Sequence, residues 1–198
     1  RLGIMIDISH VSDETFDQVL ELSAAPVIAS HSSCRAFTPD WERNMSDSMI
    51  RRLAENGGVI QIAVGSSFLK EEYRERFSAR APAKKAFLKR NALEDNHPST
   101  AKWMEDYNRE LDLLLADVTD VADHIDHVRG LVGINHVGLG SDFDGVGPTT
   151  PKGLKDVSQY PNLIQELLER GYSEVDVAKV LSGNLLRVWT KVEEVAVR

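Results

Sequence analysis

The chain has 198 residues and a mass of 22.0 kDa, at the upper end of one domain or the lower end of two. Its residues are 42% hydrophobic and 27% charged, as in ordinary globular proteins, and no apolar run approaches the roughly 20 residues of a membrane-spanning helix. The net charge of −8 argues against nucleic acid or an anionic membrane as the main partner, and the single cysteine, Cys34, excludes an intramolecular disulfide and a multi-cysteine zinc site.

The chain opens inside an apolar run. Residues 2–8 read Leu-Gly-Ile-Met-Ile-Asp-Ile, which predicts a buried strand. Because neither an initiator Met nor a signal sequence precedes this run, we expect a piece of a longer polypeptide whose cellular location stays open. Ser12 or Asp13 can then cap a helix whose predicted apolar face is formed by Phe16, Val19, Leu20 and Leu22.

Strands and helices alternate along the rest of the chain. Further strands are predicted at 26–30, 59–64 and 136–140, and helices at 46–56, 118–132, 161–170, 174–181 and 184–195. This alternation predicts right-handed βαβ units and a parallel sheet, and the nearly continuous apolar strands fit a sheet buried on both faces. Four such units make an α/β fold that is either half of an eight-unit barrel or a small open sheet.

Residues 67–112 interrupt the alternation. The segment is dense in charge, carries Pro82 and Pro98, and is far longer than an ordinary loop. A lid and a surface appendage are the two interpretations, and a solvated helical excursion is favoured. Its position after a strand would still place it near the carboxyl end of the sheet.

Two histidines follow neighbouring strands at equivalent positions. His10 ends the sequence Asp-Ile-Ser-His, and His31 follows the next strand in Ala-Ser-His-Ser. The carboxyl ends of adjacent parallel strands lie at one edge of the sheet, so both imidazoles could reach one metal ion, and imidazole is an ordinary zinc ligand. Either histidine alone would more often be a hydrogen-bonded core residue; the pair favours a metal site.

Two further residues near the strand ends could carry chemistry. Asp142 ends the last predicted strand and could be a general base or acid, or equally a loop anchor. Arg43 follows the strand of His31, and its guanidinium suits a substrate carboxylate, although a surface ion pair is the usual role of an arginine. His124 and His127 share one helical face, but pairing with Asp123 or Asp126 is favoured over metal binding there.

Several motifs together resemble the membrane (renal) dipeptidase family, peptidase family M19. The motifs are Asp7-Ile-Ser-His10, Pro26-Val-Ile-Ala-Ser-His-Ser32, Gly140-Ser-Asp-Phe-Asp-Gly145, Gly153-Leu-Lys-Asp-Val-Ser-Gln-Tyr-Pro161 and Gly183-Asn-Leu-Leu-Arg-Val-Trp189. The resemblance implies the C-terminal half, strands five to eight, of a (β/α)₈ TIM-like barrel over residues 1–198, with a charged helical insertion at about 67–112. It also implies a binuclear zinc centre that hydrolyses dipeptides.

The resemblance assigns roles to four residues. By position, His10 and His31 match two histidine ligands of one zinc ion, Asp142 matches the catalytic aspartate, and Arg43 matches the arginine that receives the C-terminal carboxylate of the dipeptide. The family's His-x-Asp pair and bridging glutamate belong to strands one to four, outside this chain, so we expect the chain alone to be inactive. Gly65-Ser66-Ser67 stands where mammalian members have a tyrosine, and the insertion resembles that of bacterial members.

The expected function is therefore a zinc-dependent dipeptidase in which a metal-activated water attacks the peptide bond. The expected partners are a dipeptide substrate and, when full length, a second copy in a homodimer. Two alternatives remain: another metal-dependent amidohydrolase acting on a cyclic amide or ester, and a non-catalytic, degenerate module used for binding.

Overall fold

A parallel three-stranded sheet forms the centre of the protein. The computed structural model describes residues 2–196. Its strands β1 (Ile28–Ser32), β2 (Val59–Ile62) and β3 (Val137–Leu139) lie in the order β1-β2-β3. Ile60 of the central strand pairs with Ala29 on β1 and with Val137 on β3. The α/β fold with a parallel sheet that the sequence predicts is therefore confirmed.

The strand predicted at residues 2–8 is wrong for most of its length. Ile8 N–H donates to the carbonyl of Ile28 at 2.8 Å and Ile28 N–H donates to the carbonyl of Ile6 at 2.9 Å, so only the end of this segment lies beside β1. Leu2 is 76% exposed. Gly3 has a positive φ of 68°, which breaks the extended conformation, and no second strand lies beside the segment within residues 2–196.

Helices pack against both faces of this sheet. They are α1 (Asp13–Leu22), α2 (Asp47–Glu55), α6 (Val118–Val132), α7 (Tyr160–Glu169), α8 (Glu174–Ala178) and α9 (Asn184–Ala196). Ser12 caps α1 because its Oγ accepts the N–H of Thr15, and Phe16 is fully buried as predicted. Leu22 is 85% exposed, against the prediction, since it lies about 240° around the helix from Phe16.

The two faces of the sheet have separate hydrophobic cores. Ile60 of β2 belongs to the larger core with α1, α2, α6 and α7, in which Leu53 and Ile125 are buried. Val59 of β2 points the other way and packs with Val188 of α9. This alternation follows from the two-residue period of a strand, and it leaves the carboxyl ends of β1, β2 and β3 open for polar side chains.

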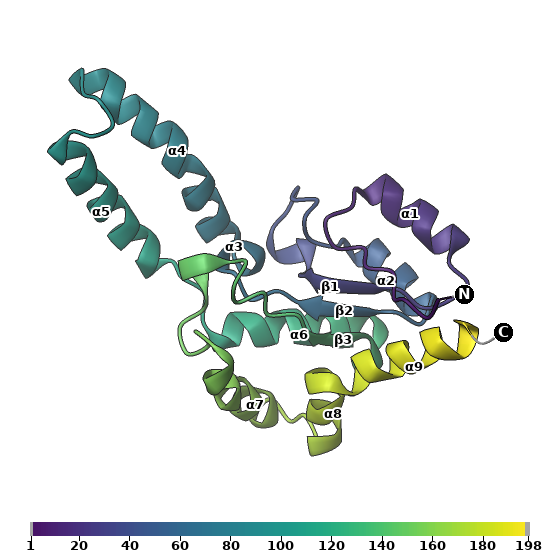
Figure 1. Cartoon of the computed structure of the whole chain (residues 1–198). Helices are drawn as coiled ribbons and strands as arrows, with labels where there is room; N and C mark the ends of the chain where they lie inside the picture. The colour runs from purple at the N-terminus through teal and green to yellow at the C-terminus, as the bar shows by residue number, and fades with distance from the viewer. Residues whose placement is uncertain (1, 197–198) are drawn as a thin grey trace.

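The segment at 67–112 is a helical hairpin. After α3 (Ser66–Leu69), α4 (Glu71–Asn91) runs away from the sheet and α5 (Pro98–Leu113) returns beside it, as Figure 1 shows. Trp103 joins the helices by stacking on Phe87, with 5.3 Å between ring centroids. Most side chains of the hairpin face solvent, as expected for a solvated excursion. None of the helices within residues 2–196 has the length and apolar composition that a membrane span requires.

Candidate active site

His10 and His31 meet at the carboxyl end of the sheet. Their Nε2 atoms lie 2.7 Å apart. Ser9 positions the turn that carries His10, because its hydroxyl accepts the backbone N–H of His31 at 3.0 Å. His10 itself has a positive φ of 68°, a conformation that is costly for most side chains and is found mainly where function requires it. The structure thus brings together the two histidines that the sequence singled out.

Hydrogen bonds fix which nitrogen of His31 carries its proton. Asp7 accepts the hydroxyl of Ser30 at 2.5 Å and the N–H groups of Ser30 and Ser9, each at 3.0 Å. Because Ser30 gives its single hydroxyl proton to this carboxylate, its oxygen accepts the Nδ1–H of His31 at 2.7 Å. The Nε2 atom of His31 is therefore left with a lone pair directed at His10.

The same reasoning applies to His10. Arg43 donates from Nη2 to His10 Nε2 at 3.1 Å, and a guanidinium can only donate, so this nitrogen also presents a lone pair. Burial, and next the positive charge of Arg43, lower the pKa of His10 and favour its neutral form. Partial burial would raise the pKa of Asp7, but the hydrogen bonds from Ser30 and Ser9 outweigh it and lower the pKa.

Two unprotonated imidazole nitrogens 2.7 Å apart fit a shared cation, which would replace Arg43 as the partner of His10 Nε2. Neutral imidazole nitrogen is a normal zinc ligand, and a ligating histidine usually donates its other N–H to a carboxylate or another acceptor, as His31 does through Ser30. Across residues 2–196, no group of three or more His, Cys, Asp or Glu side chains could hold a metal ion. The pair therefore fits a zinc ion but supplies fewer than the three protein ligands usual for catalytic zinc.

Arg43 lies beside the two histidines, and hydrogen bonds within the protein use only some of its guanidinium N–H groups. Its Nη2 donates to the carbonyl of His31 at 2.7 Å as well as to His10, and its Nη1 donates to Ser32 Oγ at 2.9 Å. These three bonds leave two of the five guanidinium N–H groups without a partner among the described residues. An oxyanion is the natural ligand for them.

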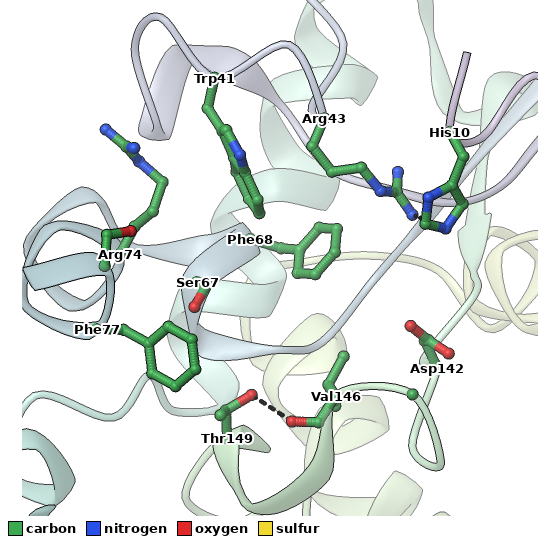
Figure 2. A pocket seen from close by; sticks show the side chains of 12 residues that line it. His10, Trp41, Arg43, Ser67, Phe68, Arg74, Phe77, Asp142, Val146 and Thr149 are labelled. Atoms are coloured by element: carbon green, nitrogen blue, oxygen red, sulfur yellow. Dashed lines mark hydrogen bonds between the residues drawn. The ribbon is translucent and has the colours of Figure 1, made fainter. Parts of the chain in front are cut away.

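Asp142 lies opposite the histidines. Figure 2 shows its carboxylate directed toward His10 across the cavity. Like His10 it has a left-handed backbone, with a φ of 59°, and its carbonyl accepts the N–H groups of Gly145 and Val146, each at 3.0 Å. A Cβ atom on Gly145 would lie 2.2 Å from Asp142 Oδ1, so the glycine makes room for the carboxylate.

His10, Arg43 and Asp142 line one cavity of about 390 Å³. These three residues stand at one end, Arg74 and Phe77 stand at the other, and Phe68 lies between them (Figure 2). Arg43 lies over the ring of Phe68, 5.0 Å from its centroid. The cavity has the size of a site for a small molecule, with convergent polar groups at one end and aromatic side chains at the other.

The histidines of α6 are structural. His124 is fully buried; its Nδ1 accepts the N–H of Cys34 at 3.0 Å and its Nε2 donates to the carbonyl of Leu69 at 3.2 Å. His127 contacts Asp47 of α2 at 2.7 Å. The predicted pairing with Asp123 or Asp126 is wrong, because those carboxylates bind Arg170.

Burial of His124 makes the stability of the fold depend on pH. Burial lowers the pKa of His124 to about 4 from the ordinary histidine value of 6.5. Below pH 6.5 the imidazole of His124 is protonated in the unfolded chain, but in the folded chain it stays neutral until the pH approaches 4. The folded state therefore loses stability as the pH falls from 6.5 toward 4. We expect the free energy of unfolding to drop by about 3 kcal/mol across this window.

Urea unfolding of the wild type and of His124→Gln at about pH 7 and about pH 4.5 measures this effect. Glutamine keeps an amide donor for the carbonyl of Leu69 but does not titrate. The free energy of unfolding of His124→Gln should therefore fall much less between these two pH values than that of the wild type. Parallel losses in both proteins would show that His124 is not the responsible group.

Sequence reasoning missed the aromatic end of the cavity and the Asp7–Ser30 support of His31. Phe68 belongs to α3 and Phe77 belongs to α4 of the hairpin. No local sequence pattern indicates that these helices line a cavity at the strand ends. Asp7 belongs to the quoted motif, but its contact with Ser30 spans 23 residues of sequence.

Comparisons with known proteins identify the family of this chain. The family described as membrane dipeptidase (peptidase family M19) matches residues 1–198. Human dipeptidase 3 is 39% identical over 98% of this chain, and dipeptidase aclJ of Aspergillus oryzae is 40% identical over 99%. The chain spans only 31% and 37% of the length of these two relatives.

A solved structure has the same fold. The probable dipeptidase PvdM of Pseudomonas aeruginosa superposes with a TM-score of 0.73 at 33% identity; the alignment covers 97% of this chain and 51% of that one. The chain thus corresponds in fold to about half of that protein.

Proposed function

The chain belongs to the membrane dipeptidase family, peptidase family M19, and from this membership we propose that it supplies the C-terminal half of a zinc-dependent dipeptidase. The chain has the α/β architecture of part of that family's TIM barrel. The observation that carries the proposal is the meeting of His10 Nε2 and His31 Nε2, 2.7 Å apart, beside a cavity that His10, Asp142 and Arg43 line.

The histidines would hold one zinc ion, with the remaining ligands and those of a second zinc ion coming from outside this chain. The chemistry that zinc supplies when bound is activation of water and polarisation of a carbonyl group. Asp7 and Ser30 support this role by keeping the lone pair of His31 directed into the site. Since the chain offers no complete set of ligands among its described residues, we propose that it has no dipeptidase activity alone.

Asp142 and Arg43 would act on the substrate itself. The carboxylate of Asp142 would accept a proton from the attacking water and pass it to the amine that leaves when the peptide bond breaks. Arg43 would bind the C-terminal carboxylate of the dipeptide through the N–H groups that His31, Ser32 and His10 leave unused.

Replacing Arg43 by leucine tests this function in the full-length protein that we propose contains this chain. We expect kcat/KM for a dipeptide with a free carboxylate to fall about 10- to 100-fold, as for loss of a hydrogen-bonded charge. The same dipeptide with an amidated C-terminus should lose much less, because it brings no charge to Arg43.

The control is Arg76→Leu, which removes an arginine that pairs with Glu110 on the hairpin and does not line the cavity. Equal losses on free and amidated substrates would assign Arg43 to the scaffold. Absence of dipeptide hydrolysis in the metal-loaded wild type would refute the proposed function.

A further inference from the structure

The far end of the cavity is built by the hairpin. Phe77 and Arg74 come from the first turns of α4, and Phe68 comes from α3, whereas His10 and Asp142 come from the strand ends (Figure 2). This end has no part in the roles assigned above to the histidines, the aspartate and Arg43. Its side chains nevertheless share one continuous space with them.

The lining of this end combines aromatic and apolar side chains with the hydroxyl groups of Ser67, Ser78 and Thr149. Phe77 is 37% exposed; the ring of Tyr73 stacks on it with 6.0 Å between centroids, and the guanidinium of Arg80 lies 5.2 Å from its centroid. Val146 also lines the cavity there. Trp41 meets Phe68 edge-on at 5.0 Å, so the wall behind the phenylalanine is itself aromatic.

Arg74, the arginine of the hairpin that lines the cavity, already has an acidic partner. Arg74 donates from Nε and Nη2 to the two carboxylate oxygens of Glu71, forming a bidentate pair. Its guanidinium also lies 6.0 Å from the ring centroid of Trp41. An acidic group placed here would have to compete with Glu71, so the chemistry of this end favours an apolar ligand over an anionic one.

Arg43 sets the orientation of a substrate relative to this end. Its guanidinium lies 5.0 Å from the centroid of the Phe68 ring, so a carboxylate bound to Arg43 would lie beside Phe68. In the proposed function this carboxylate belongs to the C-terminal residue of the dipeptide, and the peptide bond would react at His10 and Asp142. The side chain that enters the hairpin end is therefore that of the C-terminal residue of the dipeptide.

We propose that Phe68, Phe77 and Val146 form a subsite for an apolar, above all aromatic, side chain on the C-terminal residue of the substrate. This inference rests on the proposed function and adds the class of dipeptide that the site selects. Burial of an aromatic ring against two others gains both hydrophobic contact and ring stacking, whereas a glycine at this position gains neither.

The test compares glycyl-phenylalanine with glycyl-glycine in the metal-loaded, full-length protein. We expect kcat/KM to favour glycyl-phenylalanine about tenfold or more, and Phe77→Ala to remove most of that preference. Phe77→Leu keeps an apolar side chain and should retain part of it. Phe87→Ala is the matched control, since Phe87 stacks on Trp103 farther along the hairpin and does not line the cavity.

A second readout does not depend on turnover. It is the affinity for phosphinate mimics of dipeptides. Phosphinate mimics ending in alanine or phenylalanine should differ in affinity in the same direction, and Phe77→Ala should bring the two closer together.

The outcomes separate the two proposals. Equal kcat/KM for both dipeptides, or a preference that Phe77→Ala leaves intact, overturns the subsite and leaves the dipeptidase function standing. A preference for an acidic C-terminal residue overturns the subsite as well, and would mean that Arg74 releases Glu71. Failure to hydrolyse any dipeptide or to bind either phosphinate overturns both.

Discussion

Replacing Asp142 by asparagine should lower kcat of the full-length protein by about 10²- to 10⁴-fold while its zinc content stays unchanged, because the variant loses a proton acceptor and no metal ligand. Asparagine has the same shape and tolerates the left-handed backbone of this position, where φ is 59°. The loss should therefore be one of rate and not of folding. Steady-state kinetics with zinc measured per chain gives both quantities.

Asp144→Asn is the matched control for this variant. Asp144 is exposed, lies two residues further along in the same turn and does not line the cavity. The Asp144→Asn variant should therefore keep kcat within about twofold of the wild type. A normal rate in Asp142→Asn would show that another group removes the proton. Loss of zinc in that variant would move Asp142 among the metal ligands.

Replacing His31 by alanine should remove zinc and activity together. We expect the affinity for zinc to fall by more than about 100-fold, since losing a ligand costs more than losing one of its supporting groups. Ser30→Ala keeps the imidazole of His31 but removes the acceptor of its Nδ1–H, so the affinity for zinc should fall about 10- to 100-fold. Competition with a zinc-binding dye measures these affinities without reference to turnover.

His97→Ala is the control for the histidine variant. His97 caps α5 at the tip of the hairpin, where its Nδ1 accepts the N–H of Ser99 at 3.1 Å, and it should leave zinc affinity unchanged. Full zinc content in His31→Ala would overturn the metal site. A loss in His31→Ala without any loss in Ser30→Ala would restrict the role of Ser30 to the local fold.

Sequence patterns were sufficient where a residue's surroundings follow from period and position. The helix predicted at 118–132 has those bounds, because Asp117 caps it and its apolar residues recur at the helical period. The proximity of His10 and His31 could be predicted, because equivalent positions after adjacent parallel strands lie at the same edge of the sheet.

Patterns failed where a neighbour decides the outcome. The apolar residues Leu2 and Ile4 suggested a buried strand, yet burial depends on a partner that residues 2–196 do not provide. His124 could have paired with the carboxylate of Asp123, its neighbour in sequence, but the packing of α6 turns it inward to Cys34 and Leu69. The cavity's aromatic end could not be predicted, because it depends on the direction in which the hairpin leaves the sheet.

The tip of the hairpin is a natural place for protein engineering. Residues 91–99 are exposed at all but Leu93, and Figure 1 shows them at the end of α4 and α5 that lies farthest from the sheet. Exposed loop tips accept inserted sequence with little cost to the fold. An affinity tag or a fluorescent domain placed between Asp95 and Asn96 would therefore report on the protein from outside the cavity, while α4 keeps Phe77 where it is.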